Sequence, residues 1–282
     1  MPLDAAIGSS AGRHVDGLLG YPLFSRFQVE LCYVGGNVVL HDPPEQEWQG
    51  TTIPIDIVRE HAMVEAALEL PDDRRLGGTF MVDTASRSPL LLTRGFVEEH
   101  RIAESLPTTI HATTGWGIGG ATNDIVGRAQ GFELGSLRFD RPIVVCSTAR
   151  SGVLSERDWA GIVGGEILRR CHVVVDYAGG RMTLEPNGDF AQPFEHDHSG
   201  LFLVAEGDDF ETLRVHDVVS GSPAAEAGVR PGDVLATIDG RPAHDLERTK
   251  ALLRAGPGTS YRVGIVRDGS PIDTTLTLRR LV

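Results

Sequence analysis

The sequence DGLLGYPLFSRFQVELCYVGGNVVL, residues 16–40, aligns without a gap on AGIVGGEILRRCHVVVDYAGGRMTL, residues 160–184. The offset is 144 residues throughout. Each copy reads as a glycine-bounded apolar segment, a short helical turn, an alternating strand, a Gly-Gly turn and a returning strand. Such a duplication indicates two copies of one supersecondary unit. The identical pairs are Gly17/Gly161, Gly20/Gly164, Arg26/Arg170, Val29/Val173, Tyr33/Tyr177, Gly35/Gly179, Gly36/Gly180 and Leu40/Leu184.

A second stretch, Phe80-Met81-Val82-Asp83-Thr84-Ala85-Ser86, reads as an apolar strand that ends in an acidic residue. An ionised carboxylate at the end of a buried strand is costly unless it is paired or used chemically. Two interpretations stay open, namely a common Asp-Thr turn after a strand and a catalytic carboxylate. Asp83 precedes Gly161 by 78 residues, and the same spacing before Gly17 falls ahead of Met1. We therefore expect one complete lobe and the last third of another.

Composition and charge limit the class of protein. The chain has 282 residues and is 41% hydrophobic, which allows a sizeable core and favours two domains. Its net charge of −13 argues against a basic face that binds nucleic acid. No apolar run approaches the roughly 18 residues of a membrane span. The cysteines Cys32, Cys146 and Cys171 lie far apart and are expected to be small core residues, so neither a metal nor another cofactor is predicted.

Glycines surround Trp116 in the stretch TTGWGIGGAT, residues 113–122. Such a composition suits the mobile tip of a hairpin, for example a lid over a cleft. A loose surface loop is the alternative.

Two other stretches are expected to carry no chemistry. Residues 1–15 are expected to be a frayed start. The Gly8-x-Ser10-x-Gly12 match to a serine-hydrolase elbow is discarded, because that motif needs a strand before it and a helix after it and neither is available. Glu195-His196-Asp197-His198 is expected to be a solvated linker, because adjacent residues rarely face one metal ion together.

The last ninety residues have the pattern of a separate α+β unit. Ser222 and Pro223 suit the start of a one-turn helix that Gly228 closes, and Asp245 suits the N-cap of a second helix. A closing hairpin turns at Asp268-Gly269.

Two family resemblances follow from these motifs. The stretches at 80–86, 115–120, 161–164 and 17–20 resemble the retropepsin/pepsin-like aspartic proteases. Ser222-Pro-Ala-Ala-Glu-Ala-Gly, with Pro231-Gly-Asp-Val-Leu and Ile238-Asp-Gly, looks like a bacterial PDZ domain. The implied fold is mostly β, with a pepsin/retropepsin-like acid-protease β-barrel lobe, a partial second lobe and an α+β PDZ domain. The implied domains are the end of a first lobe at 1–50, a complete lobe at 51–190 and the PDZ domain at 194–282.

The resemblances also imply roles for particular residues. The catalytic set would be Asp83, Thr84 and Ser86, although Ala85 departs from the usual glycine. The flap would comprise Gly115, Trp116, Gly117, Gly119 and Gly120. The apolar strand beside the catalytic loop, the psi-loop, would comprise Gly161, Ile162, Val163 and Gly164. A peptide C-terminus would bind at Ser199, Gly200, Leu201 and Phe202 of the PDZ domain, as an added strand whose carboxylate is held by backbone N–H groups.

The function implied is an aspartic-type endopeptidase that cleaves polypeptides with a water activated between paired aspartates. That chemistry needs two carboxylates that share one proton, and this sequence supplies one. We therefore expect weak or no activity unless an upstream segment is restored or a homodimer pairs two copies of Asp83. A catalytically inactive, protease-like peptide-binding scaffold is the alternative. The resemblance favours an extracytoplasmic location in a bacterium, if a signal peptide precedes this sequence.

Overall fold

The computed structural model describes residues 7–42, 47–117 and 120–282. Its contacts group the chain into two units. Unit 1 comprises Met1–Leu18, Thr108–Val126 and Glu195–Val282, and unit 2 comprises Leu19–Pro107 and Gly127–Phe194. The structure is mostly β, as the sequence predicts. The domain boundaries at 1–50, 51–190 and 194–282 stay predictions.

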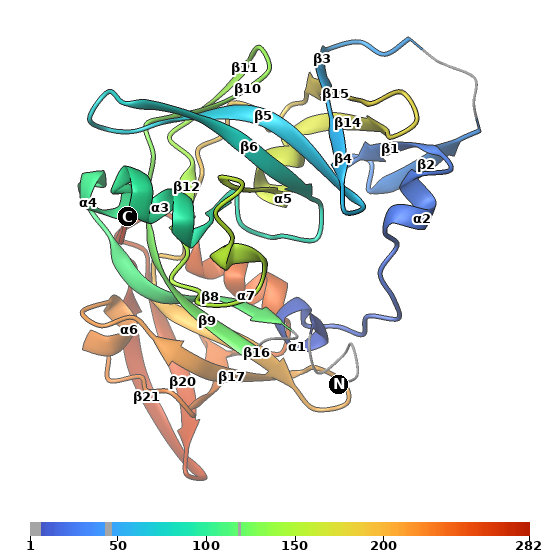
Figure 1. Cartoon of the computed structure of the whole chain (residues 1–282). Helices are drawn as coiled ribbons and strands as arrows, with labels where there is room; N and C mark the ends of the chain where they lie inside the picture. Colours follow the sequence, from blue (N-terminus) through green and yellow to red (C-terminus); the bar gives the residue numbers. More distant parts are fainter. Residues whose placement is uncertain (1–6, 43–46, 118–119) are drawn as a thin grey trace. The chain divides into compact units, whose positions relative to one another are not determined.

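A five-stranded antiparallel sheet in unit 2 holds both copies of the repeat. Its order is β2-β1-β14-β15-β3, and the two hairpins lie side by side in Figure 1. The sheet buries valines of both copies, because alternate residues of each strand face the core. The strands are β1 (Gln28–Cys32), β2 (Asn37–His41), β3 (Thr51–Pro54), β14 (Cys171–Asp176) and β15 (Arg181–Pro186).

The register of this sheet confirms the duplication. Val29 lies opposite Val175, and Leu31 lies opposite Val173. Val29 is equivalent to Val173 and Val175 is equivalent to Leu31, so exchanging the two copies converts the first pair into the second. The β1–β2 and β14–β15 hairpins also have equivalent registers, since Val29 pairs with Leu40 and Val173 pairs with Leu184. The two hairpins are therefore related by an approximate two-fold axis.

A second sheet of unit 2 follows the path β11-β10-β5-β6-β13-β7-β12. Strand β13 runs parallel to β6 and antiparallel to β7, so it is buried on both sides. Phe80 and Phe132 pack edge to face in its core, with ring centroids 5.3 Å apart. The strands, including β4 paired with β5, are β4 (Asp56–Val58), β5 (His61–Glu69), β6 (Arg75–Asp83), β7 (Leu90–Leu92), β10 (Gly131–Leu134), β11 (Leu137–Asp140), β12 (Ile143–Cys146) and β13 (Gly161–Gly164).

Short helices complete unit 2. The repeat places α2 and α5 at equivalent positions, each directly after its apolar segment. The apolar segments themselves differ. Ile162 and Val163 are buried in β13, whereas their counterparts Leu18 and Leu19 are 59% and 78% exposed. The helices are α2 (Tyr21–Phe24), α3 (Arg94–His100), α4 (Ile102–Ser105), α5 (Gly165–Leu168) and the 3-10 turn η2 (Val153–Ser155).

Unit 1 contains a sheet of order β16-β17-β18-β20-β21, with β19 paired to β18, and a hairpin of β8 and β9. Its core includes Leu213, Val215, Leu235 and Leu253. As predicted, Ser222 caps α6 and Asp245 caps α7. The elements are α1 (Ser9–Ala11), α6 (Pro223–Glu226), α7 (Leu246–Leu253), β8 (Ile110–Gly117), β9 (Gly120–Arg128), β16 (Leu201–Glu206), β17 (Thr212–Val218), β18 (Val234–Ile238), β19 (Arg241–Pro242), β20 (Ser260–Arg267) and β21 (Ser270–Thr277).

Two sequence expectations about irregular segments are wrong. Residues 7–15 are not frayed, because they include α1, which packs against β16 of the same unit; residues 1–6 lie outside the described residues. Residues 195–198 are not a solvated linker. The His198 ring is 2% exposed, its Nδ1 lies 2.7 Å from the carbonyl oxygen of Ala255, and its Nε2 lies 3.2 Å from Glu195 Oε2. Burial also lowers the pKa of His196, which favours its neutral form.

No helix in the described part of the chain is both long enough and apolar enough to span a bilayer.

Candidate peptide-binding site

Strand β16 lies at the edge of the unit 1 sheet. Among the described strands it pairs only with β17, through a register that shifts between Phe202 and Leu203. Helix α7 and the α1 segment also contact β16. An edge strand presents backbone N–H and C=O groups on its outer side, which an extended peptide can pair with.

The loop that leads into β16 binds a carboxylate oxygen. Asp197 Oδ1 accepts hydrogen bonds from Ser199 N at 2.9 Å, Ser199 Oγ at 2.6 Å and Gly200 N at 2.6 Å. Leu201 N in turn donates to Ser199 Oγ at 3.0 Å. Backbone N–H groups near Ser199, Gly200 and Leu201 were predicted to hold a ligand's carboxylate, and in this structure those of Ser199 and Gly200 hold a carboxylate of the same chain.

Glycine is required at position 200 of this loop. Gly200 has a φ of +80°, a region that other residues rarely adopt, and a Cβ there would overlap the side chain of Ser222. Ser222 is fixed because it caps α6, and Ala224 N donates to Ser199 O at 2.9 Å. The loop is therefore held against the start of α6.

The predicted flap is a hairpin, as expected. Strands β8 and β9 pair from Ile110 with Val126 to Gly117 with Gly120. Thr113 Oγ1 donates to Asp217 Oδ2 of β17 at 2.6 Å. Gly115, Trp116, Gly117 and Gly120 lie in this hairpin, and Gly119 lies outside the described residues. A lid function stays a prediction.

The structure brings Asp83 and the 161–164 segment together. Gly164 pairs with Asp83 where β13 runs along β6, and Gly165 N donates to Ser86 O at 2.6 Å. Asp83 Oδ1 accepts hydrogen bonds from Ala85 N at 2.8 Å and Ser86 N at 3.3 Å. This is the side-chain-to-backbone turn that the sequence left open as an alternative. Thr84 is exposed in the same turn.

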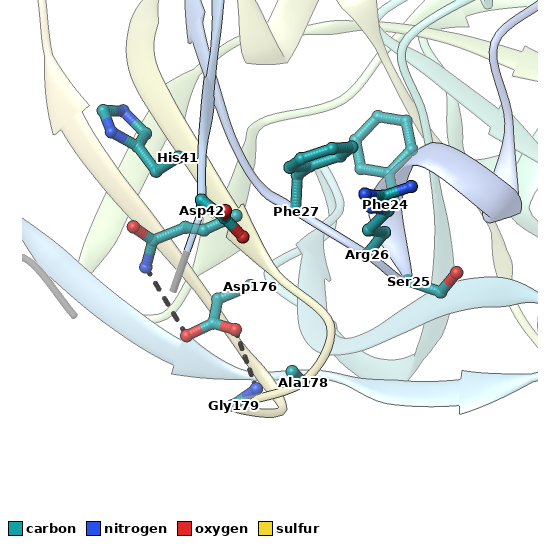
Figure 2. A pocket seen from close by; sticks show the side chains of 10 residues that line it. Phe24, Ser25, Arg26, Phe27, His41, Asp42, Asp176, Ala178 and Gly179 are labelled. Carbon is teal, nitrogen blue, oxygen red and sulfur yellow. Dashed lines mark hydrogen bonds between the residues drawn. The ribbon is translucent and has the colours of Figure 1, made fainter. Parts of the chain in front are cut away.

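A pocket of about 190 Å³ lies in unit 2 and includes none of the predicted site residues. Phe24, Phe27 and Asp42 line it, together with Asp176 (Figure 2). The Asp176 carboxylate already accepts hydrogen bonds from Gly179 N at 2.7 Å and Arg181 Nε at 3.0 Å. Because these bonds engage the Asp176 carboxylate within its own hairpin, we assign no catalytic or binding role to this pocket.

Residues 214–267 match the family model of the PDZ domain. The C-terminal part of the chain is thus a PDZ domain, as the sequence predicted. The chain is similar to the magnetosome formation protease MamE of Magnetospirillum gryphiswaldense, with 43% identity over 63 residues, or 22% of this chain and 8% of MamE. It is also similar to the periplasmic pH-dependent serine endoprotease DegQ of Escherichia coli, with 32% identity over 65 residues, or 23% of this chain and 14% of DegQ.

Solved structures give weaker matches. The HtrA3 PDZ domain bound to a phage-derived ligand has a TM-score of 0.26 and 15% identity, over 28% of this chain and 82% of that chain. The HtrA-type protease AlgW with a decapeptide has a TM-score of 0.30 and 15% identity, over 86% of this chain and 68% of that chain. At these TM-scores the superpositions do not define the fold of the remaining chain.

The comparisons contradict the predicted aspartic-type endopeptidase of the retropepsin/pepsin-like family. DegQ is a serine endoprotease. The similarity to MamE and DegQ covers 22% and 23% of this chain and spans a small part of both relatives. No comparison tests the individual assignments of Asp83, Thr84 and Ser86.

Sequence reasoning missed two residues beside the candidate peptide-binding site. Asp197 was assigned to a linker, although an Asp two residues before Ser199 is the usual spacing of a side-chain cap on a loop. Lys250 on α7 was not singled out, and its Nζ donates to Ser10 O at 3.1 Å. The local sequence around Ser10 could not predict the Lys250–Ser10 hydrogen bond, because the two residues are 240 positions apart in the chain.

Proposed function

We propose that this chain is a peptide-binding protein whose PDZ domain takes the C-terminus of an extended peptide at the β16 edge. The observation that carries the proposal is the carboxylate bound by the amides of Ser199 and Gly200. A ligand's terminal carboxylate has the same chemistry as the Asp197 side chain, so it suits the same amides once Asp197 moves aside. Backbone pairing with β16 adds affinity that depends little on the ligand's sequence.

Peptides with and without a terminal charge test this proposal. We would label decapeptides that end in Val, Leu, Ala, Asp or Lys, each as the free acid and as the amide, and measure fluorescence polarisation with the whole chain. At least one free acid is expected to bind ten times more tightly than its amide, because the amide cannot offer the carboxylate. Equal affinities of the two forms in every pair would contradict the proposal.

A matched pair of glycine variants locates the site. Gly200→Ala is expected to weaken binding of the free acid at least tenfold, because the new methyl group overlaps Ser222 and distorts the loop. Gly221→Ala is the control, since Gly221 has a φ of +67° but no neighbour within 4 Å of a new Cβ. Equal loss in both variants would place the site elsewhere.

Serine-type endopeptidase activity is a second candidate function, suggested by the activity named for DegQ. The identity that favours it covers 23% of this chain and 14% of DegQ, so a nucleophile is not assigned. Labelling of the whole chain by a fluorophosphonate, together with cleavage of unfolded casein, would support this candidate. The absence of both would remove it.

A further inference from the structure

Residues 7–14 lie against β16, the strand where a peptide would bind. Helix α1 contacts β16 (Figure 1). Gly8 within this segment is buried. On the other side, Lys250 Nζ of α7 donates a hydrogen bond to the carbonyl oxygen of Ser10, at 3.1 Å. The segment therefore contacts both elements that border the proposed site.

Two more contacts hold the segment in place. Gly12 has a φ of +67°, and a Cβ at this position would lie 2.8 Å from Leu246 Cβ of α7. Only glycine allows so close an approach in this conformation. The ring of His14 packs edge to face on Phe210, with centroids 5.0 Å apart. Contacts therefore extend along the segment rather than arising from one residue.

We propose that residues 7–14 are an intramolecular ligand that covers the β16 edge and competes with external peptides. This inference rests on the proposed peptide-binding function of the same site. A tethered segment acts at a high effective concentration, of the order of millimolar for short flexible links. External peptides then bind only the fraction of molecules in which the segment has left, so their apparent affinity falls by that fraction.

Gly12→Leu tests the covering contact, because it adds a side chain where Leu246 leaves no space. Gly36→Leu is the matched control. Gly36 has a φ of +66°, nearly that of Gly12, but nothing lies within 4 Å of a Cβ there. Both variants carry the same backbone cost, and only Gly12→Leu clashes with α7.

Deuterium exchange of the whole chain is the first readout. Amides of β16 and of the first turn of α7 are expected to exchange at least three times faster in Gly12→Leu than in the wild type and in Gly36→Leu. Unchanged exchange in Gly12→Leu overturns the proposal.

Binding in trans is the second readout. The probe is an amidated peptide of residues 7–15, which carries no terminal carboxylate. It is expected to bind Gly12→Leu at least ten times more tightly than it binds the wild type or Gly36→Leu. Equal affinities for all three proteins, or no binding to any, overturn the proposal.

The two proposals fail in different ways. If no free-acid decapeptide binds either the wild type or Gly12→Leu while the exchange difference persists, peptide C-terminus recognition fails and the intramolecular contact stands. If free acids bind both proteins with the same affinity, recognition stands and the covering role fails.

Discussion

Glu30 and Val174 lie opposite each other in the pairing of β1 with β14, and they are also equivalent residues of the two repeat copies. The approximate two-fold axis of the five-stranded sheet therefore passes between them. Where the second copy has a valine, the first has a carboxylate with two histidine partners. Glu30 Oε2 lies 2.7 Å from His41 Nε2, and Glu30 Oε1 lies 2.8 Å from His172 Nε2.

This arrangement predicts a pH-dependent contribution to stability. Burial alone would raise the pKa of Glu30, but the hydrogen bonds from His41 and His172 hold it below its usual value. A carboxyl whose pKa is lowered on folding stabilises the protein above its unfolded pKa of about 4.3, and this contribution is lost as pH falls through the folded pKa. We expect Glu30→Gln to lower the free energy of unfolding by about 1–2 kcal/mol at pH 7, with a smaller loss below pH 4.

Urea unfolding of unit 2 between pH 3.5 and pH 7.5 checks this prediction. Glu185→Gln is the control, because the Glu185 side chain is 50% exposed and lies 3.8 Å from His172 Nδ1. A difference between Glu30→Gln and the wild type that stays constant over this pH range would show that ionisation of Glu30 is not involved.

The repeat supplies a second matched experiment at its glycines. A Cβ on Gly164 would overlap the carbonyl oxygen of Ser88, whereas one on Gly20, the equivalent residue, would meet nothing within 4 Å. We expect Gly164→Ala to destabilise unit 2 by about 2–3 kcal/mol, because β13 cannot move away from its two neighbouring strands. Gly20→Ala is expected to be neutral. Thermal unfolding followed by circular dichroism gives both values, and equal effects would mean that β13 is not held as the register indicates.

The same comparison shows what the sequence could predict. The hairpins and the helix caps were predictable because each depends on residues close together in the chain, as with Ser222 on α6 and Asp245 on α7. The offset of 144 residues between the two repeat copies was predictable because it is read directly from the sequence. The exposure of Leu19 and the burial of its counterpart Val163 were not predictable, because burial depends on the strands that flank each segment rather than on the segment itself. The packing of residues 7–14 on α7 was missed for the same reason. The PDZ domain was recognisable because its turn motifs are local, whereas the stretch at residues 80–86 around Asp83 could not specify a catalytic class.

Arg170 predicts a third difference between the repeat copies. It is fully buried, and its guanidinium donates to the carbonyl oxygens of Glu166 at 3.0 Å and Asp189 at 2.9 Å and lies 3.7 Å from the ring centroid of Phe194. Burial lowers the pKa of Arg170. Lysine cannot reproduce this planar set of contacts, so Arg170→Lys is expected to cost about 2–4 kcal/mol.

Arg26, the equivalent residue of the first copy, is the control for Arg170. It is exposed, with its guanidinium 5.1 Å from the ring centroid of Phe27, so Arg26→Lys is expected to be nearly neutral. Chemical denaturation measures both variants. A similar loss in the two would indicate that charge, rather than the buried hydrogen bonds, accounts for the effect at Arg170.

The stability of the PDZ domain is also expected to depend on an ion pair, which joins Asp233 and Arg267. Asp233 is 1% exposed and accepts hydrogen bonds from Arg267 Nε at 2.7 Å, Arg267 Nη2 at 2.8 Å and Arg230 N at 2.8 Å. Burial would raise the pKa of Asp233, but Arg267 holds it below its usual value. Asp233→Asn keeps the size of the side chain but breaks the paired geometry, and should cost about 2–4 kcal/mol.

Glu226→Gln tests whether burial accounts for that loss. Glu226 pairs with Arg279 at 2.9 Å, but both side chains are more than half exposed, so solvent screens the pair and no measurable loss is expected. Deuterium exchange of β18 and β20 amides measures the stability of unit 1 without interference from unit 2. If the two variants accelerate exchange equally, burial does not set the strength of these pairs. If only Asp233→Asn does so, the carboxylate of Asp233 is needed to join the start of β18 to the end of β20, and hence to support the sheet that presents β16.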